Sequence, residues 1–224
     1  MNSLNTYIEH TKLNPTLTDR DCEILLQEAI DNYFFGVCIP PYWVKKMSRD
    51  IGLSPVQLVT VIGFPLGYQR TEAKLKEAEI ALHDGAKELD MVLNLSAFKT
   101  GMITWVKPEI AQLAKLCHEA EASLKVILET AYLSNDEIVK ACQICQEAGA
   151  DFVKTSTGFA GGGATVEHIR LMRQTVGQEM GVKASGGVKT REQAIAMIEA
   201  GADRLGTSSG VAIVQNKAES GGVY

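Results

Sequence analysis

The stretch ICQEAGADFVKT, residues 144–155, joins a helical pattern to a short apolar run. Gly149 follows the last helical turn, where glycine is the usual residue because it readily adopts the left-handed conformation that ends a helix. The apolar run after it is typical of a strand buried on both faces. Helices that alternate with such strands predict βαβ units and a parallel sheet. The same join recurs, with Gly85 and Gly201, in EIALHDGAKELDMVLN (79–94) and AIAMIEAGADRLGT (194–207).

Eight segments have strand character, and helical segments such as 71–84 and 166–176 lie between them. Eight βα units in 224 residues predict an α/β fold, a (β/α)8 TIM barrel that forms a single domain over residues 1–224. A doubly wound open sheet is the main alternative. The polar, glycine-containing tail from about residue 215 is predicted to be flexible. The predicted strands are 6–11, 36–39, 57–63, 87–94, 124–129, 151–155, 181–185 and 203–206.

The composition argues against several classes of protein. Hydrophobic residues make up 46% of the chain and the net charge is -5, so a large core is available and no basic nucleic-acid-binding face is indicated. No apolar run approaches the roughly 20 residues of a membrane helix. The N-terminus lacks the basic start and apolar stretch of a signal peptide. We therefore expect a cytoplasmic protein that binds neither nucleic acid nor membrane.

The five cysteines and four histidines do not indicate a metal site. An odd number of cysteines without a signal peptide predicts free thiols. Cys142 and Cys145 form a lone CxxC on one face of a helical segment, which favours core packing over metal or redox use. The histidines are scattered, with no HxxxH or HxH pair, so we expect neither a metal nor a cofactor.

Two lysines interrupt strands that otherwise have a buried pattern. Alternate side chains of a strand face opposite sides, so one simple arrangement directs the apolar residues outward and Lys154, Lys183 and Asp90 into the barrel. A barrel lysine can simply fill space beside a carboxylate. However, two ammonium groups in a poorly hydrated site lower each other's pKa. The resulting free amine can attack a carbonyl, and Asp90 adds a group for proton transfer.

Glycine and small hydroxyl residues follow three of the predicted strands. Such segments offer backbone N–H groups and hydroxyls to an anion, and the loops after strands 7 and 8 are the common phosphate site of this barrel. We therefore expect a phosphorylated substrate; the alternative is that the glycines only form tight turns. The GxxGGG spacing of 158–163 does not match a dinucleotide-binding pattern. The three segments are STGFAGGG (156–163), SGGV (185–188) and GTSSG (206–210).

Six segments together resemble the 2-deoxyribose-5-phosphate aldolases, over nearly the whole chain. The resemblance implies a metal-independent (β/α)8 barrel that cleaves 2-deoxy-D-ribose 5-phosphate reversibly to D-glyceraldehyde 3-phosphate and acetaldehyde. A lysine Schiff base carries the reaction in that family. The resembling segments are VTVIGFPLG (59–67), ELDMVLN (88–94), LKVILETAYLSNDEIVKAC (124–142), GADFVKTSTGF (149–159), GVKASGGV (181–188) and AGADRLGTSSGVAIV (200–214).

Carried over by motif, the resemblance implies that Lys154 forms the Schiff base, Lys183 lowers its pKa and Asp90 transfers protons. Two positions depart from the family pattern. Glu9 stands where the N-terminal motif usually has Asp, and Phe159 stands where some members have a phosphate-contacting lysine. The resemblance places the phosphate contacts on Gly158, Gly186, Gly187, Gly206, Ser208 and Ser209.

Three questions stay open at the level of sequence. The chain could be another lysine-dependent aldolase of phosphorylated sugars, or a non-catalytic sugar-phosphate sensor, although intact Lys154, Lys183 and Asp90 argue against the latter. It could form a homodimer or a higher homo-oligomer. Tyr224, after Gly221 and Gly222, is either part of a frayed terminus or a proton relay, because the family often ends in a tyrosine that reaches back over the active site.

Overall fold

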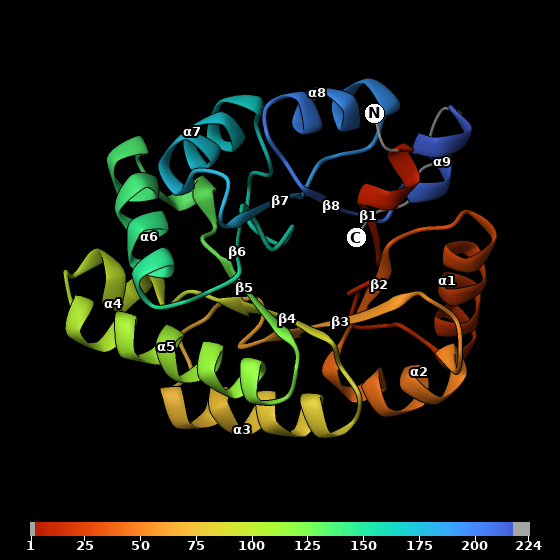
Figure 1. Ribbon diagram of the computed structural model, residues 1–224, viewed down its shortest axis with the longest axis horizontal. Coiled ribbons are helices and arrows are strands. Elements are labelled where there is room, and N and C mark those ends of the chain that lie inside the picture. Colours follow the sequence, from red (N-terminus) through yellow and green to blue (C-terminus); the bar gives the residue numbers. More distant parts are fainter. Residues whose placement is uncertain (1–2, 217–224) are drawn as a thin grey trace.

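The computed structural model describes residues 3–216, which form a closed ring of eight parallel strands surrounded by helices (Figure 1). Each strand pairs with the next along the chain, and the first pairs with the last. The predicted barrel is therefore confirmed, and the open sheet is excluded. The strands are β1 (Ile8–Thr11), β2 (Gly36–Ile39), β3 (Gln57–Ile62), β4 (Glu88–Val92), β5 (Ser123–Ile127), β6 (Phe152–Lys154), β7 (Gly181–Ser185) and β8 (Arg204–Thr207).

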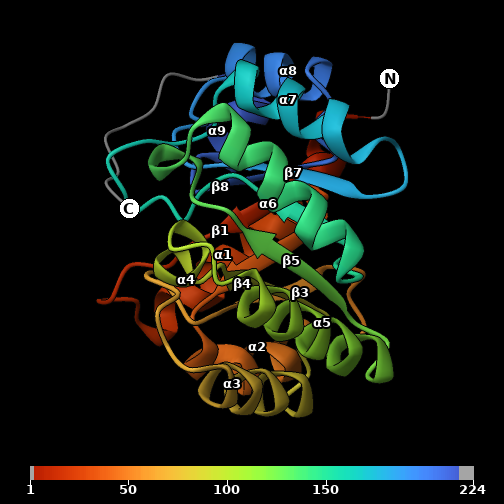
Figure 2. The same cartoon turned by 90° about the vertical axis from the view of Figure 1, so that its left-hand side faces the viewer.

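The helices lie outside this ring and pack against its outer face. The α-helices are α1 (Asp19–Asp31), α2 (Val44–Ile51), α3 (Thr71–His83), α4 (Leu95–Lys99), α5 (Ile103–Glu119), α6 (Asn135–Glu147), α7 (Val166–Val176), α8 (Arg191–Glu199) and α9 (Gly210–Gln215). Figure 2 shows two of the longer helices, α5 and α6, next to each other outside the sheet. The 3-10 turns are η1 (Leu4–Tyr7), η2 (Pro41–Trp43) and η3 (Thr130–Tyr132).

The repeated glycine join has the predicted conformation. Gly85, Gly149 and Gly201 follow α3, α6 and α8, and their φ angles are 109°, 82° and 114°. Side chains with a Cβ rarely adopt this region, so glycine ends each helix at low cost and lets the chain enter the next strand. All three joins therefore deliver the chain to the same end of the barrel, where β4, β6 and β8 begin.

The two faces of the strands carry different chemistry. Leu89, Met91, Val153 and Val182 face outward and join the large apolar core between sheet and helices, as the alternation predicts. The inner face carries a smaller apolar cluster that includes Cys38, together with buried charged residues. The barrel interior is thus apolar on one side and ionic on the other.

Cys142 and Cys145 both lie buried in the outer core, on α6. Burial raises the pKa of the Cys142 thiol to about 12 and that of Cys145 well above its usual range. Within residues 3–216, no helix combines the length and the apolar character that crossing a bilayer requires. The predicted flexible tail begins at the end of α9, and its residues 217–224, with the Tyr224 hypothesis, lie outside the described part of the chain.

Candidate active site

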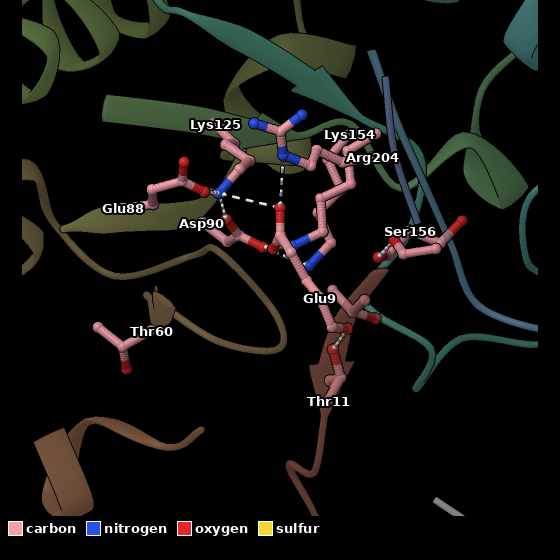
Figure 3. A network of polar contacts seen from close by, with 12 residues as sticks. Glu9, Thr11, Thr60, Glu88, Asp90, Lys125, Lys154, Ser156 and Arg204 are labelled. Atoms are coloured by element: carbon pink, nitrogen blue, oxygen red, sulfur yellow. Dashed lines mark hydrogen bonds and ion pairs between the residues drawn. The ribbon is translucent and has the colours of Figure 1, made fainter. Parts of the chain in front are cut away.

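The predicted catalytic residues meet inside the barrel. Asp90 projects inward from β4, Lys154 from β6 and Lys183 from β7, and Lys154 and Lys183 are direct partners in the β6–β7 register. Figure 3 shows Asp90 between the labelled lysines, enclosed by the strands. Strand alternation is the cause, because each of these residues has outward-facing apolar neighbours.

The carboxylate of Asp90 is the centre of the cluster. Its Oδ2 accepts a hydrogen bond from Nζ of Lys154 at 2.7 Å and another from Nζ of Lys183 at 2.7 Å. Its Oδ1 accepts from Nζ of Lys125 at 3.0 Å. One carboxylate therefore joins three ammonium groups, and one of its oxygens contacts both predicted lysines.

Glu9 completes the environment of Lys183 from β1. Its Oε2 accepts a short hydrogen bond from Nζ of Lys183, and its Oε1 lies 3.6 Å from Nζ of Lys125 and 4.0 Å from Nε of Arg204. The side chain is completely buried. Glu9 stands where the family motif usually has Asp, and with its extra methylene it still contacts the lysine cluster.

Lys125, Glu88 and Arg204 are members of the cluster that the sequence analysis missed. Lys125 is fully buried on β5 and forms ion pairs with Glu88 and Asp90. The guanidinium of Arg204 lies over the ring of Phe35, 3.7 Å from its centroid. Lys125 interrupts LKVILE in the same way that Lys154 interrupts DFVKT, so the alternation of side chains along this strand is the signal that identifies it.

The two predicted lysines differ in protonation. Burial lowers the pKa of Lys154, and the charge of Lys183 lowers it further, against the opposing effect of Asp90. Burial also acts on Lys183, but the carboxylates of Asp90 and Glu9 outweigh it and leave the pKa of Lys183 raised. Asp90 is buried as well, yet Lys125, Lys154 and Lys183 hold its pKa well below its usual range. Lys154 is therefore the ammonium that gives up its proton most readily.

The charges of the cluster balance when Lys154 is neutral. Besides Lys154, the described cluster has three cationic side chains, Lys125, Lys183 and Arg204, and three carboxylates, Glu9, Glu88 and Asp90. Because uncompensated charge is costly in a buried site, this count favours a neutral Lys154 when all three carboxylates are ionised. Burial raises the pKa of Glu88, and the ammonium of Lys125 beside it opposes that rise. The geometry thus favours a free amine beside a carboxylate and an ammonium.

Apolar residues line the opposite side of the interior. Cys38, Val59 and Val61 lie there with Leu13, and burial raises the pKa of the Cys38 thiol to about 11. The thiol is consequently neutral at physiological pH. This wall lowers the local polarity, which strengthens the interactions among the charged groups facing it.

The predicted phosphate loops approach each other at the mouth of the barrel. Gly158 and Gly186 have φ angles of 88° and 80°. A Cβ atom on Gly186 would stand 3.1 Å from Cα of Gly163 and 3.6 Å from Cα of Gly158, and one on Gly163 would overlap the carbonyl of Gly186. A Cβ atom on Gly187 would meet open space. The absence of side chains therefore lets the two loop backbones approach closely and leaves the backbone of Gly187 uncovered, which would give an anion access to backbone N–H groups.

The third predicted phosphate segment is divided between a strand and a helix start. Gly206 lies within β8, where a Cβ atom would stand 3.0 Å from Cε of Lys183, so its visible role is to make room for that lysine. Ser208 is exposed and Ser209 is buried just before α9. The backbone N–H of Ser209 donates to Oγ1 of Thr207 at 2.9 Å, so this N–H is paired within the loop.

Phe159 gives the mouth of the site an apolar edge. It is 45% exposed and packs edge-on against Phe64, with ring centroids 5.2 Å apart. Phe64 lies in the loop after β3, so this pair spans the opening between two loops. At this position the chain offers an aromatic surface to a ligand instead of a positive charge.

Sequence comparisons connect this geometry to a family of aldolases. A family model described as DeoC/LacD family aldolase matches residues 4–216. The chain is 56% identical over 211 residues to the deoxyribose-phosphate aldolase of Thermococcus gammatolerans, covering 93% of this chain and 94% of that protein. It is 51% identical over 222 residues to the deoxyribose-phosphate aldolase of Brevibacillus brevis, covering 99% and 100% of the two chains.

Solved structures give the same result. An aldolase named QR15 superposes with a TM-score of 0.91 at 45% identity, covering 96% of both chains. A deoxyribose phosphate aldolase from Aeropyrum pernix, described as tetrameric, superposes with a TM-score of 0.90 at 36% identity, covering 95% of this chain and 90% of that one.

Proposed function

This chain belongs to the DeoC/LacD family of aldolases, and on that basis we propose that it cleaves 2-deoxy-D-ribose 5-phosphate reversibly to D-glyceraldehyde 3-phosphate and acetaldehyde. In this proposal Lys154 is the nucleophile, Asp90 the proton-transfer group and Lys183 the neighbouring cation. The observation that supports it most directly is the single oxygen of Asp90, which contacts Nζ of both Lys154 and Lys183 at 2.7 Å.

The reaction begins with attack of the neutral amine of Lys154 on the aldehyde carbon of the open-chain sugar. The carbinolamine that forms loses water and becomes a positively charged iminium. Lys183, with its raised pKa, remains an ammonium throughout and keeps the pKa of Lys154 low. The two neighbouring lysines therefore have different tasks, although both lie in the same buried cluster.

Cleavage of the C2–C3 bond follows. Asp90 is ionised, because its pKa is held low, and accepts the proton of the C3 hydroxyl directly or through water. The electrons of the C2–C3 bond move into the iminium, which produces an enamine of acetaldehyde on Lys154 and releases glyceraldehyde 3-phosphate. Protonation of the enamine carbon regenerates an iminium. Addition of water then frees acetaldehyde and Lys154.

The phosphate lies at the mouth of the barrel in this proposal. The backbone around Gly158, Gly186 and Gly187, with the hydroxyls of Ser208 and Ser209, surrounds it. The close approach of the two glycine loops supports this location. No cofactor or metal has a role in any step.

Reductive trapping tests the assignment of the nucleophile. The protein is incubated with acetaldehyde and borohydride, and the modified lysine is identified by peptide mass mapping. We expect the two-carbon adduct on Lys154 and none in the Lys154→Met variant. An adduct on Lys183 would reverse the two roles, and a panel of aldehyde donors would show whether acetaldehyde is the preferred one.

We also propose a cytoplasmic location and assembly into a homo-oligomer. Five buried free cysteines suit a reducing compartment. The relative from Aeropyrum pernix, described as tetrameric, supports self-association. Analytical ultracentrifugation of the purified protein gives the oligomeric state, and a sedimentation coefficient of a monomer at micromolar concentration would contradict this part of the proposal.

A further inference from the structure

The buried carboxylate of Glu129 has no part in the mechanism above, yet its backbone is strained. Glu129 lies between β5 and η3, with φ 53° and ψ 65°. Among the non-glycine residues with positive φ within residues 3–216, it is the one that is buried, with 2% exposure. Such conformations persist where the surrounding contacts impose them, and they concentrate at functional sites.

The contacts of Glu129 lead to the loop after β6. Its Oε2 accepts a hydrogen bond from the backbone N–H of Thr157 at 3.1 Å and a short one from the hydroxyl of Thr157. Oγ1 of Thr157 in turn accepts from the backbone N–H of Phe159 at 3.0 Å. Glu129 therefore holds Thr157 directly and Phe159 through Thr157. These two residues flank Gly158, the first of the proposed phosphate contacts.

The left-handed turn at Glu129 is compatible with continued pairing to β6. The N–H of Thr130 still donates to the carbonyl of Thr155 at 2.9 Å. The far end of the same loop is held separately, because the N–H of Ala164 donates to the carbonyl of Gly186 at 2.9 Å. Near its start the loop is also held by the hydroxyl of Ser185, which donates to the carbonyl of Ser156 at 2.6 Å. Glu129 is the contact that holds Thr157, the residue directly before Gly158.

We propose that Glu129 is a positioning residue for the substrate phosphate: it holds Thr157 so that the backbone around Gly158 has the shape that binds the anion. This inference rests on the proposed function, because it assumes that a phosphate binds at Gly158. Glu129 contacts Thr157 and need not touch the substrate.

The charge of Glu129 gives this role a distinctive signature. A carboxylate near an anion site repels the anion, so its contribution here must come from its two hydrogen bonds and not from its charge. Glu129→Gln keeps an acceptor oxygen at the same reach and removes the charge. We therefore expect this variant to bind phosphate at least as tightly as the native protein, whereas an acid or base at this position would be inactivated by the same change.

Steady-state kinetics provide the first test. Glu129→Ala should raise KM for 2-deoxyribose 5-phosphate about tenfold, because the two hydrogen bonds that hold Thr157 are lost. It should leave kcat/KM for unphosphorylated deoxyribose and the acetaldehyde adduct on Lys154 unchanged. Thr157→Val removes the hydroxyl, and with it the hydrogen bond to Glu129 and the one from the N–H of Phe159, but it keeps the contact between the N–H of Thr157 and Glu129. It should change KM in the same direction, and it preserves a test if Glu129→Ala does not fold.

A control variant separates positioning from general stability. Thr130→Val makes the same chemical change as Thr157→Val at a buried hydroxyl on the residue next to Glu129. In the part of the chain that the structure describes, this Thr130 hydroxyl has no hydrogen-bond partner. It should leave KM for the phosphorylated sugar unchanged. Equal losses on phosphorylated and unphosphorylated substrates in Glu129→Ala, or loss of activity in Glu129→Gln, would overturn the proposal.

Binding of inorganic phosphate distinguishes this inference from the proposed function. Its dissociation constant is measured by calorimetry for the native protein, Glu129→Ala and Glu129→Gln. Weaker binding in the alanine variant alone supports the positioning role even if the native protein fails to cleave the proposed sugar. Equal phosphate binding in all three proteins refutes it, even if the aldolase activity is confirmed.

Discussion

Lys154 and Lys183 occupy equivalent positions on neighbouring strands, and both are buried. They differ in the number of carboxylates that each contacts. Lys183 contacts Glu9 and Asp90, whereas Asp90 is the one carboxylate that Lys154 contacts within residues 3–216. The second carboxylate keeps Lys183 charged, and its absence lets burial lower the pKa of Lys154. In the proposed mechanism, the choice of Lys154 over Lys183 as nucleophile thus follows from one additional carboxylate beside Lys183.

Replacing Lys183 should shift the pH dependence of the reaction. In Lys183→Leu, Lys154 loses a nearby positive charge and becomes the main partner of Oδ2 of Asp90, so its pKa rises. Less free amine is then present at neutral pH, and the acid limb of kcat/KM moves to higher pH. A pH–rate profile measures this shift. Lys140→Leu, on an exposed position of α6, is the matched control and should leave the profile in place.

An unmoved acid limb with a native rate in Lys183→Leu would contradict the electrostatic role of Lys183. The trapping experiment on the same variant provides a second check. Its adduct should still form on Lys154 at alkaline pH, where the amine is deprotonated despite its higher pKa.

Lys125 should be important for both stability and rate. Lys125→Met leaves Glu88 without its ammonium partner and Oδ1 of Asp90 without its donor, while Oδ2 of Asp90 keeps Lys154 and Lys183. Breaking a buried pair such as Lys125–Glu88 costs about 3–5 kcal/mol. Adding Glu88→Gln removes the orphaned charge and should recover most of the free energy of unfolding, measured by denaturant titration. The rate should stay low, because Oδ1 of Asp90 still lacks the ammonium that orients it.

Full recovery of kcat in the Lys125→Met/Glu88→Gln double variant would show that Lys125 only neutralises Glu88. Recovery of stability without recovery of rate would instead separate the structural function of Lys125 from its orientation of Asp90.

At the scale of elements, the glycine joins and strand alternation predicted the ring of strands and the inward direction of Lys154, Lys183 and Asp90. The same alternation applied to β5 would also have found Lys125. Alternation could not predict the contact between Glu9 and Lys183, because it depends on how β1 meets β8 when the ring closes. It also could not predict the left-handed turn at Glu129, since glutamate gives no local signal for that conformation.

The glycine loop after β6 offers a matched pair of substitutions. A Cβ atom on Gly163 would stand 2.2 Å from the carbonyl oxygen of Gly186, whereas one on Gly161 would meet open space. Gly163→Ala should therefore push the two loops apart and raise KM for the phosphorylated sugar, and Gly161→Ala should have no effect. Similar KM values in the two variants would indicate that the phosphate does not depend on the approach of these loops.

At the scale of the whole molecule, all five cysteines are buried. Burial raises the pKa of Cys38 to about 11 and that of Cys117 to about 12, so these thiols are protonated at neutral pH. Because the thiolate is the reactive form, the native protein should react very slowly with a thiol reagent such as dithionitrobenzoate. The denatured protein should release the full five equivalents expected from the sequence. A rapidly reacting thiol in the native protein would contradict this arrangement of the fold.

In the proposed reaction Lys154 becomes an iminium, and the ionic cluster then carries one positive charge more than its three carboxylates, when ionised, neutralise. A phosphorylated sugar brings an anion with it, so the substrate supplies a counter-ion at the time the covalent cation forms. The negative charge of the substrate phosphate then offsets the positive charge of the iminium. An unphosphorylated sugar must react without this compensation. Added phosphite dianion should therefore accelerate cleavage of unphosphorylated deoxyribose, while chloride at equal ionic strength should not.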